Sequence, residues 1–156
     1  MFGFGKSKVI EFVTPLEGEI IKIDQVDDPV FSEKMMGDGF AIMPTNGKIY
    51  APIDGEVASI FPTGHAIGIK HGEKLEVLIH FGLETVKLKG EGFTTHVKQG
   101  DKVKAGDLLI EVDINKVKPL VPSIVTPVIF TLLENKTFDV KYGETKAKET
   151  GRITIK

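Results

Sequence analysis

Glycine and proline recur along this chain at intervals too short for long helices. The 156 residues include 17 glycines and 8 prolines, which favour turns and destabilise the interior of a helix. The runs between them are rich in isoleucine, valine and phenylalanine, as β-strands are. This pattern predicts strands at 11–15, 18–24, 40–44, 47–52, 55–61, 65–70, 75–81, 108–113, 124–133, 137–143 and 151–156.

Helical periodicity is scarce in this sequence. Segments 83–88 and 113–118 could each form a turn or two of helix. Asp113 would cap the second of these turns and Pro119 would end it. We therefore predict an all-β fold, an antiparallel β-sandwich or barrel-sandwich of short strands with one or two short helical turns.

Two segments of the chain resemble each other. Residues 13–23, VTPLEGEIIKI, and residues 50–60, YAPIDGEVASI, share the order apolar, any residue, proline, two residues, glycine, glutamate, apolar. A proline cannot donate to a sheet ladder, and the glycine permits a tight turn into the next strand. The two segments are either an internal hybrid-motif repeat or two hairpins with the same turn chemistry.

The charge balance excludes several classes of protein. The net charge is −2 and Arg152 is the only arginine, which excludes nucleic-acid recognition through arginine. The chain has no cysteine, hence no disulfide, thiolate nucleophile or cysteine-bound metal. No apolar segment approaches the roughly 20 residues that cross a bilayer, so no stable membrane insertion is expected. We expect a cytoplasmic monomer with a short flexible tail at 1–8 and a single domain at 9–156.

The candidate reactive groups are histidines. His80 lies in the apolar run 75–81, and His65 begins the preceding strand. A short turn separates the two strands, so an antiparallel hairpin would bring the two imidazoles to one face, with Cβ atoms about 5 Å apart. A lone histidine in an apolar run is more often structural than reactive, and this alternative stays open. His71 and His96 are expected on the surface.

Familiar catalytic signatures are missing. The sequence contains no HExxH motif, no GxSxG elbow and no phosphate-binding P-loop. His65 and His80 would form half of a zinc site, which usually takes three or four protein ligands, so a zinc hydrolase would need a further ligand. The acidic stretch 27–38 is either a solvated surface or a rim that attracts a basic partner.

Seven segments carry a resemblance to a known family. They are VTPLEGEI, VFSEKMMGDGFAIMP, APIDGEV, FPTGHAIGI, LIHFGLETVKLKGEGF, GDKVKAGD and TPVIF. From residue 9 to 156 the chain resembles the glucose-family enzyme IIA of the bacterial phosphoenolpyruvate-dependent sugar phosphotransferase system, in a Gram-positive-like branch. The resemblance implies a phosphotransferase component with a phosphohistidine intermediate, built on a compact antiparallel β-sandwich with a shallow active face.

The resemblance also implies roles for individual residues and partners. His80 would be phosphorylated, His65 would be the second active-site histidine, and Thr63 would orient the ring of His65. The donor would be the histidine-phosphorylated carrier HPr. The acceptor would be a cysteine on the IIB domain of a glucose-type membrane permease, so that sugar uptake is coupled to phosphorylation.

Phosphoryl transfer through a histidine requires a neutral ring with one free nitrogen. We expect the Gly82 carbonyl to accept a hydrogen bond from His80 Nδ1, which would leave Nε2 as the nucleophile. His65 would then stabilise the transferring phosphoryl oxygens. The scheme requires no cofactor and no metal, although His65 and His80 could be two ligands of a zinc ion completed by a partner.

Apolar residues around the histidines would dock partners and keep water from the phosphohistidine. The residues expected in this surface are Val30, Phe31, Met35, Met36, Phe61, Leu78 and Val86, with Asp28 and Glu84 as an acidic rim. A second hypothesis is a regulatory module that docks other proteins according to its phosphorylation state, because phosphorylation adds about two negative charges to this surface.

Overall fold

A large antiparallel sheet runs through the whole molecule. The structure, a computed structural model, describes residues 10–156, and the tail expected at 1–8 lies outside them. In spatial order the sheet consists of β12 (Gly143–Thr145), β1 (Gly18–Lys22), β2 (Gly39–Pro44), β10 (Thr126–Leu133), β6 (Leu75–His80), β5 (Ala66–His71), β4 (Gly55–Ile60) and β8 (Lys102–Val103). Each pair of neighbouring strands is antiparallel.

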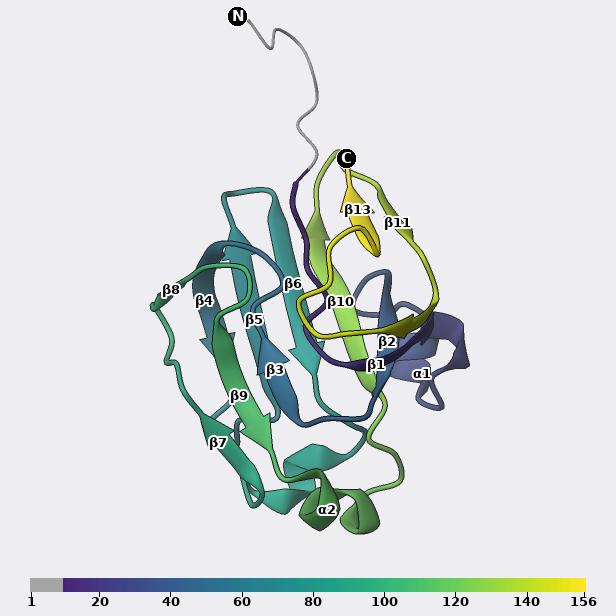
Figure 1. Cartoon of the computed structure of the whole chain (residues 1–156), viewed down its shortest axis with the longest axis vertical. Coiled ribbons are helices and arrows are strands. Elements are labelled where there is room, and N and C mark those ends of the chain that lie inside the picture. Colours follow the sequence, from purple (N-terminus) through teal and green to yellow (C-terminus); the bar gives the residue numbers. More distant parts are fainter. Residues whose placement is uncertain (1–9) are drawn as a thin grey trace, which may run out of the picture.

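Two smaller sheets complete the structure. One contains β3 (Lys48–Tyr50), β9 (Leu108–Val112) and β7 (Phe93–Thr95), and the other contains β11 (Phe138–Val140) and β13 (Ile153–Ile155) (Figure 1). The helical elements are α1 (Pro29–Ser32), α2 (Ile114–Val117), η1 (Ile23–Gln25), η2 (Thr85–Leu88) and η3 (Lys118–Leu120). The predicted all-β antiparallel fold is confirmed.

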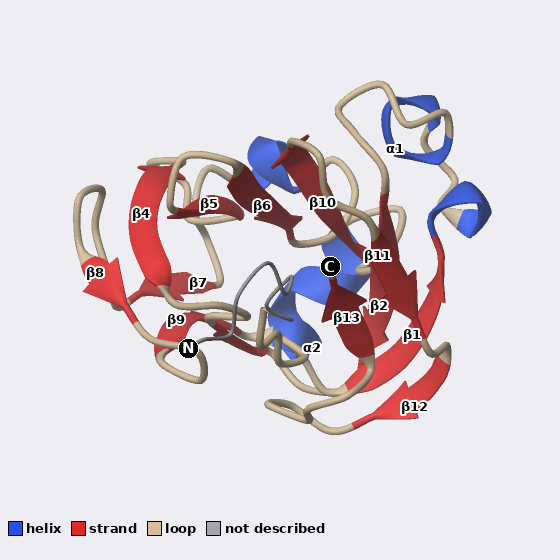
Figure 2. Ribbon diagram, turned by 90° about the horizontal axis from the view of Figure 1, so that it is seen from above, coloured by secondary structure: helices blue, strands red, loops and turns tan. Residues whose placement is uncertain are grey.

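The main core lies between the large sheet and the smaller ones. Figure 2 shows the large sheet curving from β4 through β6 and β10 to β1, with β9 and β13 on its concave side. Three phenylalanines pack at the centre: the ring centroids of Phe12 and Phe40 are 6.3 Å apart, and those of Phe12 and Phe130 are 5.9 Å apart. Their burial removes a large apolar area from water, which is the main driving force for folding.

The opposite face of the large sheet carries a second apolar cluster. Because side chains alternate along a strand, Val77 and Ile79 enter the main core while Leu78 and His80 face the other side. There Leu78 packs with residues of η1 and α1, including Ile23 and Phe31. Figure 2 shows α1 on the convex side of the sheet, beside β2 and β10. This convex face holds the histidines.

The two similar segments occupy equivalent places in the fold. Gly18 begins β1 and Gly55 begins β4, and a Cβ on either would lie within 2.3 Å of a carbonyl oxygen on the next strand. Backbone hydrogen bonds also run in both directions between the segments. The Val13 amide donates to the Pro52 carbonyl at 2.8 Å, and the Tyr50 amide donates to the Pro15 carbonyl at 2.9 Å. These equivalences support the internal repeat.

Several predicted elements differ from the structure. Residues 11–15 form no strand and pair only through the isolated bridge from Val13 to Thr150. The segment 137–143 divides between β11 and β12, and the sequence reasoning missed β7, β8 and α1. These elements are two to four residues long, too short for a periodic signal.

The helical turn at 113–118 is present, but its end differs from the prediction. The Asp113 carboxylate accepts from the Lys116 amide at 3.2 Å, as a cap should. Pro119 does not end the helical segment, because η3 continues through it to Leu120. A proline is tolerated in the first turn of a helix, where its missing N–H would have no partner.

Truncating the central aromatic cluster should destabilise the protein. Phe40 has no exposed surface and contacts Phe12 and Phe130, so Phe40→Ala should lower the free energy of unfolding by about 3–5 kcal/mol. Urea unfolding measures this change. Tyr142→Ala, at a side chain that is 44% exposed, is the control and should change it by about 0.5 kcal/mol or less. Equal losses in both variants would contradict the assignment of the core.

Candidate functional site

The hairpin of β5 and β6 brings His65 and His80 together. Ala66 lies directly opposite His80 in the strand register, and His65 immediately precedes Ala66. The Phe81 amide donates to the His65 carbonyl at 2.7 Å, which extends the pairing past the end of both strands. The two imidazole centroids are 5.0 Å apart with an interplanar angle of 78°.

The tautomer of His80 follows from its hydrogen bond. Its Nδ1 atom lies 2.9 Å from the Gly82 carbonyl oxygen. A carbonyl oxygen only accepts, so Nδ1 carries the proton, and in the neutral ring Nε2 keeps its lone pair. Gly82 reaches this position with a φ of +71°, which glycine adopts without strain.

His65 is less exposed to solvent than His80, which is half-buried. His65 is 2% exposed, and its Nδ1 atom is hydrogen-bonded to the Thr63 hydroxyl. A hydroxyl that donates to Nδ1 leaves the imidazole proton on Nε2. The Phe61 ring packs on His65 with centroids 5.0 Å apart, and the Phe31 ring packs on His80 at 5.2 Å. Besides the other imidazole, each ring is therefore held by one hydrogen bond and one phenylalanine.

The apolar surroundings keep both rings neutral near pH 7. Burial, assisted by the neighbouring His80, lowers the pKa of His65 from 6.5 to about 4. Burial also lowers the pKa of His80, and this effect outweighs the hydrogen bond to Gly82 and the negative charge of Asp28, both of which favour protonation. Desolvation disfavours the charged form of an imidazole. Both rings are therefore uncharged, and Nε2 of His80 is unprotonated.

The expected docking residues divide into exposed and buried groups. The exposed apolar residues are Val30, Met35, Met36, Phe61 and Val86, with exposed fractions between 39% and 69%. Phe31 and Leu78 differ from the expectation, since they are only 4% and 7% exposed and belong to the cluster beneath α1. Alternation along β6 directs Leu78 toward α1, and the turn of α1 directs Phe31 toward the sheet.

The two expected rim carboxylates also have structural partners. Asp28 accepts from the Val30 amide at 3.0 Å and so caps α1. Glu84 is exposed and forms an ion pair with Lys87 on the same turn. The remaining acidic residues of this stretch, Asp27, Glu33 and Asp38, are exposed, and Asp38 lies 3.5 Å from the Lys34 ammonium.

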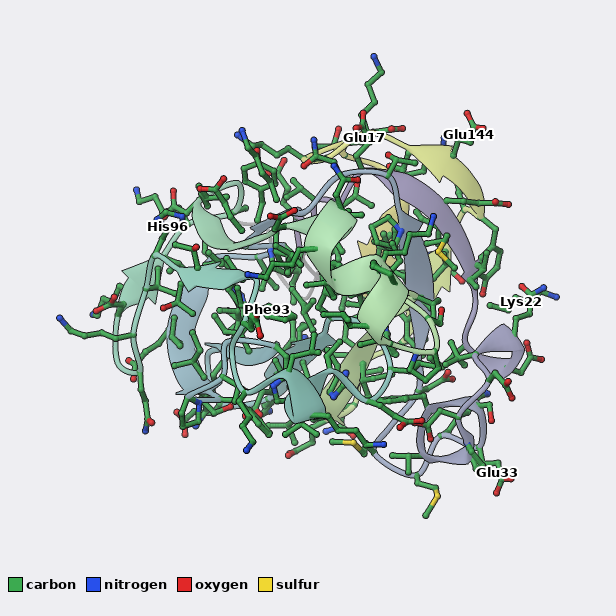
Figure 3. The ribbon with its side chains drawn as sticks, turned by 90° about the horizontal axis from the view of Figure 1, so that it is seen from below. Glu17, Lys22, Glu33, Phe93, His96 and Glu144 are labelled. Atoms are coloured by element: carbon green, nitrogen blue, oxygen red, sulfur yellow. The ribbon has the colours of Figure 1, made fainter. Side chains whose placement is uncertain are left out.

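The other two histidines lie outside this cluster. His71 is half-buried, and its Nδ1 atom donates to the Asp54 carbonyl at 2.6 Å, so it is less solvated than expected. His96 is exposed and lies 2.9 Å from a Glu111 carboxylate oxygen. Figure 3 shows His96 on the opposite side of the molecule from Glu33, which directly follows α1. Within residues 10–156, no group of three or more potential ligands could hold a metal ion.

Comparisons with known proteins agree with this arrangement. Residues 10–136 match the family model of the phosphoenolpyruvate-dependent sugar phosphotransferase system, EIIA 1. The chain is 52% identical over 144 residues to the PTS system glucose-specific EIIA component of Halalkalibacterium halodurans, an alignment that covers 91% of this chain and 83% of that one. It superposes on the glucose permease IIA from Mycoplasma capricolum with a TM-score of 0.91 and 44% identity, covering 98% and 99% of the two chains.

A further relative is a longer protein. The chain is 55% identical over 120 residues to the PTS system glucosamine-specific EIICBA component of Bacillus subtilis. That alignment covers 77% of this chain but 19% of the relative. The matching region is therefore one part of a larger multidomain component in that organism.

The fold, the site and these matches define a phosphoryl carrier of sugar uptake. The chain belongs to the EIIA 1 family of the phosphoenolpyruvate-dependent sugar phosphotransferase system. It is a phosphotransferase component of this system. Among residues 10–156 we find no helix that is long and apolar enough to span a membrane.

Lowering the pH should destabilise the protein through its buried histidines. In unfolded chains His65 ionises near 6.5, but in the folded protein only near 4. Between these values the unfolded state binds more protons, so the free energy of unfolding should fall as the pH is lowered from 6.5 to 4. Below both values the contribution of His65 becomes constant.

Urea unfolding at a series of pH values, for the parent protein and His65→Gln, isolates this contribution. The variant should show a shallower loss of stability over the same range, because glutamine binds no proton. Parallel curves for the two proteins would mean that His65 ionises equally in the folded and unfolded states.

Proposed function

We propose that His80 accepts a phosphoryl group from histidine-phosphorylated HPr and passes it to a cysteine on the IIB domain of a glucose-type permease. The observation that carries this proposal is the hydrogen bond from His80 Nδ1 to the Gly82 carbonyl. It leaves Nε2 unprotonated beside a second neutral imidazole, on the face of the sheet that carries exposed apolar residues. A structural core histidine would have no need of such a neighbour.

Each half of the proposed cycle exchanges one bond to phosphorus for another. In the uptake step the Nε2 lone pair of His80 forms an N–P bond, while the N–P bond of the donor breaks and its electron pair returns to the donor histidine. In the discharge step a IIB cysteine thiolate forms an S–P bond, and the electron pair of the broken N–P bond returns to Nε2. Neither step requires a metal, a redox partner or water.

His65 acts as the stabilising donor in this proposal. Negative charge is spread over the phosphoryl oxygens in the transition state. The Thr63 hydroxyl, bonded to His65 Nδ1, orients the ring so that Nε2–H can donate to an oxygen. A preorganised donor in a water-poor site stabilises developing charge without reorganisation during the reaction. A neutral His65 does this without binding the phosphoryl group so tightly that it is retained.

The exposed apolar residues around the histidines form the proposed docking surface. We define this surface as Val30, Met35, Met36, Phe61 and Val86. Methionines keep such a surface apolar and adaptable, which suits one surface that meets both a donor and an acceptor. Asp28 and Glu84 at its edge favour basic partners. Phosphorylation of His80 adds about two negative charges at the centre of this surface, so docking of any regulatory target would depend on phosphorylation.

The proposed unit of function is the domain 9–156, acting in the cytoplasm as a monomer. The family match over 10–136 and the structural match over 98% of the chain support this extent. The two relatives that are named for different sugars have similar identities, 52% and 55%. This similarity supports a domain that transfers phosphoryl groups without binding the sugar. If zinc binds, a partner would complete the coordination by His65 and His80.

Replacing each histidine should separate acceptance from donation. His80→Gln removes the nucleophile and should abolish phosphorylation in a mixture of phosphoenolpyruvate, enzyme I and HPr. His65→Gln should still accept a phosphoryl group but donate it to IIB about a hundredfold more slowly or worse. Quenched-flow assays with labelled phosphate follow both steps. An acid-labile phosphate on His80→Gln would refute the assignment of the nucleophile.

Replacing an aromatic of the docking surface should weaken partner binding. Phe61→Gln removes a 44% exposed apolar side chain beside His65 and should raise the KM for phosphorylated HPr about tenfold. The matched control is Tyr142→Gln, an equally exposed aromatic outside this surface, which should leave KM unchanged. Similar KM values for the two variants would remove Phe61 from the docking surface.

A further inference from the structure

A buried threonine, Thr85, lies beside the turn that contains Gly82. Thr85, the first residue of η2, is fully buried. Its hydroxyl donates to the Phe81 carbonyl at 2.6 Å. This bond joins the residue after His80 to the start of η2, and so closes the turn that contains Gly82. A buried hydroxyl is costly to leave without a partner, so the bond restrains both ends of the turn.

The methyl group of Thr85 restrains the same turn by packing. A Cβ built on Gly82 would lie 2.7 Å from Thr85 Cγ2 and 3.1 Å from the Ser123 carbonyl oxygen. The methyl group therefore fills the space beside the Gly82 backbone, and no larger residue fits there. With a φ of +71°, Gly82 has the conformational freedom to turn its carbonyl elsewhere, and close packing removes that freedom.

In the described part of the chain, the other backbone hydrogen bonds of the turn hold Phe81 and Leu83, on either side of Gly82, but not Gly82 itself. The Phe81 amide donates to the His65 carbonyl at 2.7 Å, and the Leu83 amide donates to the Ser123 carbonyl at 2.9 Å. These bonds fix the backbone on either side of Gly82. Glu84 is left-handed, with a φ of +60°, a conformation that a residue with a side chain keeps only when its surroundings enforce it.

We propose that Thr85 is a positioning residue for phosphoryl transfer: its hydroxyl and methyl group hold the Gly82 carbonyl on His80 Nδ1 and so keep Nε2 free to attack. The inference rests on the proposed role of His80 as the nucleophile. If the carbonyl turns away, the proton of the neutral ring distributes between Nδ1 and Nε2. The fraction of rings with a free Nε2 falls, and the uptake rate falls with it.

Two substitutions separate the hydroxyl from the methyl group. Thr85→Val keeps the shape of the side chain and removes the donor, while Thr85→Ser keeps the donor and removes the methyl group. Thr14→Val is the matched control, because Thr14 is equally buried and its hydroxyl contacts Thr145, Lys146 and Glu149 on β12 and the segment after it. The order of sheet strands places β12 four positions from β6.

The main readout is the ¹⁵N NMR spectrum of the imidazole nitrogens of His80. The parent protein and Thr14→Val should show a protonated Nδ1 and an unprotonated Nε2. In Thr85→Val the two shifts should move toward each other as the tautomers mix, and phosphoryl uptake from HPr should slow about twofold, in proportion to the lost fraction of free Nε2. Thr85→Ser should recover most of the parental tautomer and rate. Thermal unfolding of each variant gives the accompanying loss of stability.

The outcomes distinguish this inference from the proposed function. If Thr85→Val shows the parental ¹⁵N shifts and slows uptake no more than Thr14→Val does, Thr85 is merely structural and the inference is overturned. If Thr85→Val fails to fold, Thr85→Ser decides alone: a small shift toward mixed tautomers, caused by the missing methyl group, supports the inference, and shifts identical to those of the parent overturn it. The spectra need no phosphoryl transfer, so they test the positioning role even if His80→Gln still accepts phosphate and refutes the nucleophile.

Discussion

The pairing of β5 with β6 in one register is the constraint on which the site depends. Ala66 lies opposite His80, so both face the convex side of the sheet, and His65, in the turn just before β5, brings its ring against His80 there. A slip of one residue would turn His80 into the main core and bring the apolar Ile79 to the surface. The large free energy of burying Val77 and Ile79 therefore fixes the position of His80, the proposed nucleophile, which contributes little to that burial itself. Stability and function depend on the same alternation.

The chemistry of the site arises from surroundings that are apolar without being closed. Enough apolar surface surrounds the rings to lower both pKa values. Each imidazole therefore carries one proton rather than two, and one of its nitrogens keeps a lone pair. The Gly82 carbonyl then selects which nitrogen of His80 is free. A fully enclosed pair would be as neutral but unreachable for a partner protein. The segment that contains η1 and α1 buries its own Phe31 against Leu78, while Val30 and Phe61 stay exposed.

The internal repeat explains how a chain of short strands builds this open face. The hairpins that begin at Gly18 and Gly55 each need a glycine where the backbone approaches the next strand. Reciprocal bonds between the segments around Val13 and Tyr50 tie the two halves together across the core. Between the halves, β10 and β6 join them into one sheet. The histidines lie next to this junction, and Phe31 from the first half packs on His80 from the second, with ring centroids 5.2 Å apart.

The amino-acid pattern by itself determined the class of fold, most strands, the helical turn after Asp113 and the two histidines that meet. These follow from local chemistry: turn residues, β-branched runs and a short hairpin whose register a hydrophobic pattern dictates. Only the tertiary structure decided that residues 11–15 are not a strand, that Phe31 and Leu78 are buried, and that Thr85 lies beneath Gly82. Each of these depends on contacts between segments distant in the chain or on a left-handed turn. A sequence pattern records which residues are apolar, but not which distant neighbour each one will meet.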